Sequence, residues 1–85
     1  MIVQKWHVEL EDNSHEVEYR YSKLSGKTTL VLNGEEFTVK GKIFGIGVRR
    51  SEPIIVGSVQ GVLNIDRSGR AKLIVREAVS VSERK

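Results

Sequence analysis

The side chains best suited to proton transfer near neutral pH are two histidines, His7 and His15. His7 falls on the polar side of an alternating segment, where we expect Glu18 of the next segment to lie opposite it. A histidine beside a carboxylate can act as an acid–base pair. On the outer surface of a sheet, however, such a pair usually only stabilises the two strands. His15 is expected on the other side, at a hairpin end, where it would shield Leu10. We therefore expect no catalytic residues and no enzyme activity.

Metal and cofactor sites are equally hard to build from these residues. The chain has no cysteine, and its two histidines lie in segments that place them on opposite faces. The acidic cluster 11–14 lacks the glycine and the bidentate glutamate of a calcium loop, so it is interpreted as a turn. The run 45–50 resembles a glycine-rich phosphate loop, but a strand pattern and Pro53 follow it where such loops lead into a helix. We expect no metal and no cofactor.

Basic residues offer an alternative kind of site. The net charge is +3, from 14 Lys and Arg against 11 Asp and Glu, and most of the excess follows residue 40. A cluster of positive charge is typical of proteins that bind anions or nucleic acid. Aromatic residues make up 6% of the chain, too few for a visible base-stacking platform. Nucleic acid is therefore the less favoured partner, and the candidate anion-binding residues are Arg49, Arg50, Arg67 and Arg70.

The element that must position these groups is a hairpin closed at Asn33-Gly34. This dipeptide between two β-rich runs favours a type I′ turn, whose two central residues both need positive φ. A two-residue turn fixes the register and places Leu30 opposite Phe37 on an apolar side. An isolated hairpin is not stable in water, so the remaining chain must cover that side. Leu24, just before the hairpin, is expected to plug one end of the core.

The rest of the chain predicts further short antiparallel strands and no helix. Turn signals recur every 8–12 residues, which is typical of a β-sandwich or a partly closed small barrel. We predict one domain over residues 1–85, with about seven strands and a frayed tail at 82–85. Besides the two hairpin strands, these are expected over 2–10, 15–21, 43–50, 54–66 with a kink at Gly57, and 71–81.

The register of the first hairpin is less well determined. Pairing Leu10 with His15 would place Trp6 opposite Tyr19 in the core. Two of the three outer pairs would then carry like charges, which is mildly unfavourable. The like-charged pairs are Lys5 with Arg20 and Glu9 with Glu16. The register of this hairpin could therefore differ by one step from the pairing of Leu10 with His15.

An apolar row on the nominally outer face is the most informative pattern for function. A loop at 67–69, with Gly69 in the left-handed region, pairs Ile65 with Ala71 and puts Val62 beside Ile74 on the opposite face. Ile55 extends this row, and Val31 is a further candidate for it. In a two-layer sandwich the row faces water and would mark a protein partner or a second copy of the chain. In a closed barrel, or under a covering tail, it would be buried.

Several short motifs resemble the Fas apoptotic inhibitory molecule family. They occur in the family's order, in the segments 6–10, 15–18, 25–27, 30–36, 55–57, 62–66 and 69–75. The chain departs from the family pattern at Asn33, where aspartate is usual, and near Ile54 and Ala71, where aromatic residues are expected. The animal proteins carry two such domains in tandem, so the chain resembles a single-domain member.

The resemblance implies a compact antiparallel β-sandwich without a catalytic centre that acts through protein contacts. In animals the family protects cells against death-receptor signalling and protein aggregation, and these roles do not transfer to a lone domain. No functional residue can be carried over, because the matching positions are turn and core positions. The chain also has no apolar run long enough to cross a membrane and no signal-peptide pattern, so we expect a cytoplasmic protein that does not bind membranes.

Overall fold

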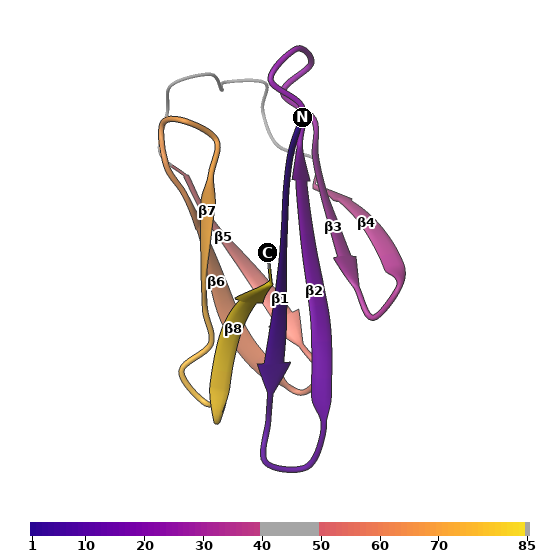
Figure 1. Cartoon of the computed structure of the whole chain (residues 1–85), viewed down its shortest axis with the longest axis vertical. Helices are drawn as coiled ribbons and strands as arrows, with labels where there is room; N and C mark the ends of the chain where they lie inside the picture. Colours follow the sequence, from indigo (N-terminus) through magenta and orange to yellow (C-terminus); the bar gives the residue numbers. More distant parts are fainter. Residues whose placement is uncertain (40–49, 85) are drawn as a thin grey trace.

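A computed structural model describes residues 1–39 and 50–84, and these form eight β-strands (Figure 1). The predicted all-β antiparallel fold is confirmed, and the described strands lie in two sheets, as in the sandwich alternative. The strands are β1 (Ile2–Glu9), β2 (Ser14–Tyr21), β3 (Thr28–Leu32), β4 (Glu35–Val39), β5 (Arg50–Val56), β6 (Val59–Ile65), β7 (Ala71–Ile74) and β8 (Ser80–Arg84).

The larger sheet has the order β4-β3-β2-β1-β8 and the smaller one the order β5-β6-β7. Neighbouring strands are antiparallel throughout. The two sheets face each other, and the apolar side chains of alternating strand positions fill the space between them. The core includes Trp6, Val8, Val17, Tyr19, Tyr21, Leu30, Val56, Leu63, Ile65 and Leu73.

The organising hairpin forms as predicted. Leu30 pairs with Phe37, and Asn33 and Gly34 have φ values of 52° and 85°. Leu30 is buried, whereas Phe37, on the edge strand β4, is 45% exposed. The predicted plug, Leu24, is wrong: it is fully exposed in the connection between β2 and β3.

The first hairpin pairs two residues away from the expected register. Val8 pairs with His15 and Lys5 with Glu18, because the turn is Leu10–Asn13, closed by a Leu10 N–H···O Asn13 bond of 2.7 Å, and not Glu11–Ser14. A two-residue shift keeps every side chain on its face, since strand side chains alternate with a period of two. It also replaces the like-charged outer pairs with favourable ones.

The number of strands and the course of the C-terminal segment differ from what the sequence predicts. Gly57, with φ 65°, closes a two-residue turn instead of kinking one strand, so β5 and β6 are separate. Of the predicted strand 43–50, only Arg50 is among the described residues, where it begins β5. The chain also leaves β7 after Ile74 and crosses to the other sheet as β8. The predicted frayed tail is wrong for residues 82–84, because they pair with β1.

Three polar contacts hold the sheets together inside or beside the core. The buried Gln4 amide of β1 donates to Ala71 O at 2.9 Å and accepts from Ala71 N at 2.6 Å. The Tyr19 hydroxyl donates to Gly69 O at 2.7 Å. Arg50 Nη2 of β5 donates to Thr28 Oγ1 of β3 at 2.9 Å. These contacts fix how the outer faces of the two sheets are presented.

Candidate functional site

The outer face of β5–β6–β7 carries the predicted apolar residues Ile55, Val62 and Ile74, together with Pro53, which was not among the predicted residues. The register places Pro53 opposite Val62 and Val62 opposite Ile74, so the three side chains form one cross-strand row. Val62 and Ile74 are 39% and 38% exposed, and Ile55 beside them is 62% exposed. These residues line a shallow depression of about 1030 Å³. We call this surface, made of Pro53, Ile55, Val62 and Ile74, the apolar face.

Val31, the fourth candidate for this row, does not belong to it. It lies on β3, opposite Glu18, in the other sheet. Sequence alternation assigns a residue to a side of its own strand, but it does not say which sheet that strand joins. The apolar face is therefore confined to the smaller sheet.

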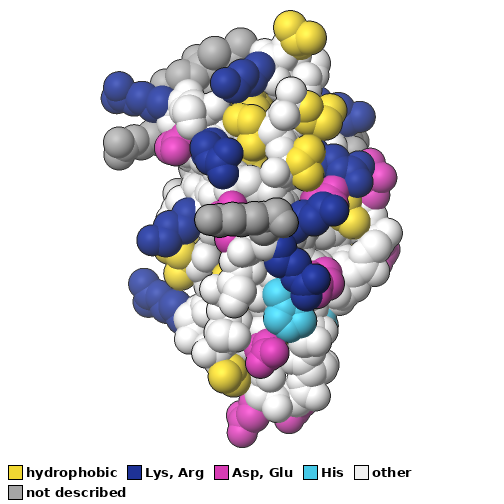
Figure 2. All heavy atoms as spheres, viewed as in Figure 1, with side chains coloured by type: hydrophobic (Ala, Val, Ile, Leu, Met, Phe, Trp, Pro, Cys, Tyr) yellow, Lys and Arg dark blue, Asp and Glu magenta, His cyan; other side chains and the backbone are white. Residues whose placement is uncertain are grey.

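The border of the apolar face is basic. Lys72 of β7 and the exposed Arg76, two residues after the end of β7, precede and follow Ile74 in the chain, and Arg76 lines the same depression. Figure 2 shows Lys and Arg side chains along the side of the molecule on which β7 lies. The outward positions of the three strands contain no carboxylate, and the acidic residue that lines the depression is Glu77, after β7. The outward positions are Ser51, Pro53, Ile55, Gln60, Val62, Asn64, Lys72 and Ile74.

The outer face of the larger sheet has a different character. Ion pairs join its strands, with Lys5 Nζ 3.6 Å from Glu18 Oε1 of the adjacent strand and Arg84 Nη2 3.0 Å from Glu16 Oε1 across β1. Arg20 also pairs with Glu18. Such a face is well solvated and leaves little apolar area for a partner. The two outer faces thus differ in what they can bind.

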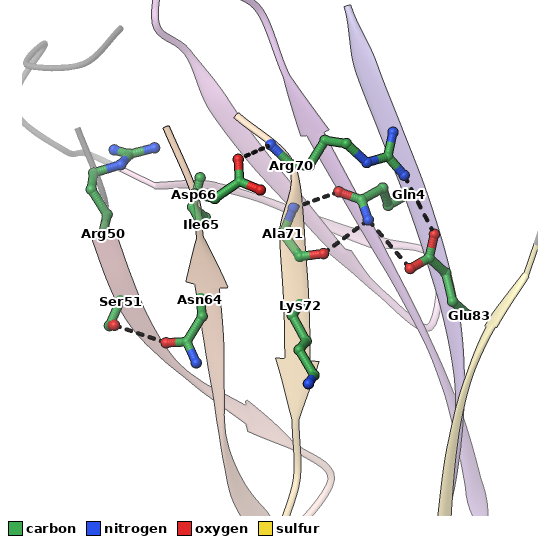
Figure 3. A pocket seen from close by; sticks show the side chains of 10 residues that line it. All are labelled: Gln4, Arg50, Ser51, Asn64, Ile65, Asp66, Arg70, Ala71, Lys72 and Glu83. Atoms are coloured by element: carbon green, nitrogen blue, oxygen red, sulfur yellow. Dashed lines mark hydrogen bonds and ion pairs between the residues drawn. The ribbon is translucent and has the colours of Figure 1, made fainter. Parts of the chain in front are cut away.

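The three described arginines of the predicted anion site do not all meet in one place. Arg50 and Arg70 line a cleft of about 550 Å³ together with Lys72, but their charged ends lie apart from one another (Figure 3). Arg50 bonds to Thr28, and Arg70 lies 3.7 Å from a carboxylate oxygen of Glu83. Arg67 is exposed on the β6–β7 turn and is not among the residues that line the cleft. Arg49 lies outside the described residues.

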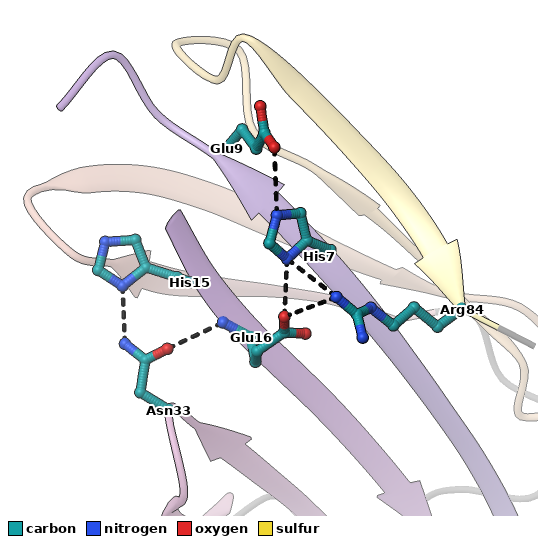
Figure 4. Close-up of polar contacts among 6 residues, drawn as sticks. All are labelled: His7, Glu9, His15, Glu16, Asn33 and Arg84. Carbon is teal, nitrogen blue, oxygen red and sulfur yellow. Dashed lines mark hydrogen bonds and ion pairs between the residues drawn. The ribbon is translucent and has the colours of Figure 1, made fainter. Parts of the chain in front are cut away.

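His7 forms a different pair from the predicted one. Its Nδ1 lies 2.7 Å from Glu16 Oε1, and Arg84 of β8 approaches the same oxygen (Figure 4). Its Nε2 lies 3.4 Å from Glu9. The hydrogen bond to Glu16 raises the pKa of His7 and lowers the pKa of Glu16.

Among the described residues no group of three or more His, Cys, Asp or Glu side chains could hold a metal ion.

His15 takes a position that the sequence did not reveal. It lies on the face opposite to His7, as expected, and it contacts residues of three turns. Its Nε2 lies 3.0 Å from Asn13 Oδ1 and its Nδ1 2.7 Å from Asn33 Nδ2. Its ring also covers Gly57, where an added Cβ would lie 2.5 Å from Nε2. No spacing in the sequence predicts that the three turns meet.

The described part of the chain contains no helix that is long and apolar enough to span a membrane. No curated protein and no solved structure shows a significant match to the chain. A model of the Fas apoptotic inhibitory molecule family (FAIM1) matches residues 2–75, which include β1–β7 in full. This match covers most of the chain and agrees with the resemblance seen in its motifs. The chain therefore belongs to the Fas apoptotic inhibitory molecule family.

Proposed function

We propose that the chain is a non-enzymatic binding module that docks a short segment of another protein on the apolar face. The partner segment would carry apolar side chains for the row of Pro53, Val62 and Ile74, flanked by Asp or Glu. The observation that carries the proposal is the apolar row on an outer face that has no carboxylate at its outward strand positions.

Charge complementarity supports an acidic partner. Lys72 and Arg76 stand beside the apolar row, and charges at the border of an interface steer a partner of opposite sign and fix its register. Glu77 is a single carboxylate at one end of the depression. A basic segment would have no favourable charge interaction with Lys72 and Arg76.

The size of the apolar face supports a segment over a whole second copy. Two strands of seven residues and one of four, about 4.8 Å apart, present roughly 300 Å². A standard stable interface needs about 800 Å² from each partner. A single extended strand or one helix face matches the smaller area, and such segments bind through a few apolar anchors.

The test uses a short synthetic peptide in which Asp and Leu alternate, and a control peptide with Lys in place of Asp. Binding is followed by amide chemical shifts of the full chain. We expect the acidic peptide to shift the resonances of β5, β6 and β7, and the basic one to leave them unchanged. The double variant Val62→Lys/Ile74→Lys should lose this binding, while Val3→Lys, at an exposed apolar position of the other sheet, should keep it.

Three outcomes contradict the proposal. The first is equal binding of both peptides, and the second is chemical-shift changes confined to the larger sheet. The third is a dimer of the unmodified chain, seen by light scattering, that the double variant abolishes. That third result would assign the apolar face to self-association.

A further inference from the structure

The C-terminal strand β8 is held on the larger sheet by few side-chain contacts. It pairs with β1 over five residues, from Lys5↔Arg84 to Glu9↔Ser80, and with no other described strand. Val81 is half-buried against the core, and the other four residues are exposed. Segments with little buried apolar area and exposed hydrogen bonds open most readily. β8 is therefore an edge strand that can detach from its sheet at low cost.

Apart from the packing of Val81, the side-chain contacts of β8 are polar. Arg84 Nη2 is 3.0 Å from Glu16 Oε1, and Glu83 is 3.7 Å from Arg70 and 3.4 Å from the Gln4 amide. Exposed ion pairs contribute little stability, because water solvates the separated charges well. They do, however, specify a register, since Glu83 and Arg84 meet oppositely charged groups at different positions of the fold.

The connection before β8 is short and lies between the two sheets. The chain leaves the smaller sheet at Ile74 and reaches β1 at Ser80. Two backbone bonds shape the link, from Ala78 N to Val75 O at 3.2 Å and from Val79 N to Glu9 O at 2.7 Å. If the first bond opens, the five residues 75–79 can extend to about 17 Å. That reach is enough to place β8 on a neighbouring molecule.

We propose that β8 exchanges between two copies of this chain, so that β8 of each copy pairs with β1 of the other. The partner is a second copy because only an identical β8 reproduces the contacts of Glu83 with Gln4 and Arg70 and of Arg84 with Glu16. The exchange is reciprocal and closes a two-fold dimer. The contacts of β8 itself recur in the dimer, so the balance depends on chain concentration and on the link.

The test uses cysteines as position markers, because the chain has none of its own. His7 and Ser82 are paired residues. Paired Cα atoms of antiparallel strands lie about 4.5–5.5 Å apart, within the range of a disulfide. Chains carrying only His7→Cys are refolded together with chains carrying only Ser82→Cys at about 1 mM. This concentration is chosen because a strand tethered by a short link has an effective concentration in the millimolar range. The mixture is then diluted and oxidised.

We expect a disulfide-linked heterodimer several-fold more abundant than in a control mixture of His7→Cys with Leu24→Cys. Leu24 is fully exposed and lies far along the chain from β8. Equal heterodimer yields in the two mixtures would overturn the exchange.

A second variant tests the link directly. Deleting Glu77 and Ala78 leaves three residues between β7 and β8, which removes slack from the link that must turn back within one molecule. We expect this variant to be a dimer by light scattering at concentrations where the full chain is monomeric. Adding Val62→Lys/Ile74→Lys should not change that dimer, which separates strand exchange from association through the apolar face. A folded monomer of the deletion variant would contradict the proposal.

Discussion

The side chain of Gln4 bonds to the backbone of Ala71 as a neighbouring strand residue would. Its amide donates to the carbonyl oxygen at 2.9 Å and accepts from the N–H at 2.6 Å. Ala71 lies on β7, at the edge of the smaller sheet, and Gln4 is 3% exposed on β1. One side chain thus satisfies both backbone groups of an edge residue and links the two sheets. The orientation of the apolar face relative to the rest of the molecule depends on this link.

Replacing Gln4 with methionine, of similar size, should lower the free energy of unfolding by about 2–4 kcal/mol, because two backbone groups of Ala71 lose their partners. Urea denaturation followed by circular dichroism measures the loss. Gln60→Met, at an exposed position of β6, is the matched control and should change stability little. Equal effects of the two substitutions would show that the Gln4 amide contributes no more than an exposed one.

Gly69 and Gly34 both have positive φ, at 93° and 85°, but their surroundings differ. A Cβ at Gly69 would lie 2.8 Å from the ring of Tyr21, whereas a Cβ at Gly34 meets nothing within 4 Å. Gly34→Ala should therefore cost only the backbone strain, about 1 kcal/mol. Gly69→Ala adds a clash with a core ring and should cost about 2–4 kcal/mol. Thermal unfolding of both variants checks the order, and the reverse order would contradict the packing described.

Asn33 combines a turn conformation with two side-chain hydrogen bonds. Its Oδ1 accepts from Glu16 N at 2.8 Å, and its Nδ2 lies 2.7 Å from His15 Nδ1. Asn33→Gly keeps the positive φ and loses only these bonds, so we expect a loss of about 1 kcal/mol. Asn33→Ala also brings the cost of a left-handed backbone and should be less stable by about 1 kcal/mol more. Chemical denaturation measures the stability of both variants. Equal stabilities of Asn33→Gly and Asn33→Ala would mean that the left-handed backbone costs nothing and that only the side-chain hydrogen bonds contribute.

The pair of His7 and Glu16 gives a pH dependence whose sign follows from the two pKa shifts. The pKa of His7 is raised by its hydrogen bond to Glu16, so its contribution to stability is present below the ordinary histidine pKa. It is lost as pH rises through the raised value. The pKa of Glu16 is lowered, chiefly by the same bond, so its contribution is lost as pH falls through that lowered value.

NMR titration of the His7 ring checks this prediction. We expect Glu16→Gln to bring the pKa of His7 down toward its ordinary value, because the hydrogen bond to a carboxylate is removed. Glu36→Gln, an exposed carboxylate of β4, should leave it unchanged. A His7 titration that does not respond to Glu16→Gln would contradict the contact.

Docking of an acidic segment on the apolar face should depend on salt and on the two border cations. We expect Lys72→Glu with Arg76→Glu to weaken binding of the Asp-Leu peptide roughly tenfold and to remove most of its salt dependence. The control is Lys23→Glu with Lys27→Glu, in the β2–β3 connection. Isothermal titration at two salt concentrations measures both, and equal losses would point to a nonspecific effect of net charge.

Local patterns in the sequence determined the turns and the faces of the strands. Asn33-Gly34 fixed the register of its hairpin, because a two-residue turn leaves no alternative pairing. Likewise, the loop at Gly69 paired Ile65 with Ala71, which put Val62 beside Ile74 on an outer face. These outcomes depend only on neighbouring residues and on the period of two along a strand, so the apolar face could be predicted.

The tertiary structure decided which strand lies beside which, and in which sheet. Nothing local distinguishes a continuous strand over 71–81 from β7 and β8 in different sheets, because both alternate in the same way. The pairing of β8 with β1, the junction at His15 and the bond between Gln4 and Ala71 all join residues far apart in the chain. Such contacts form only where the packing of two sheets brings them together, and a pattern with a period of two carries no information about distant partners.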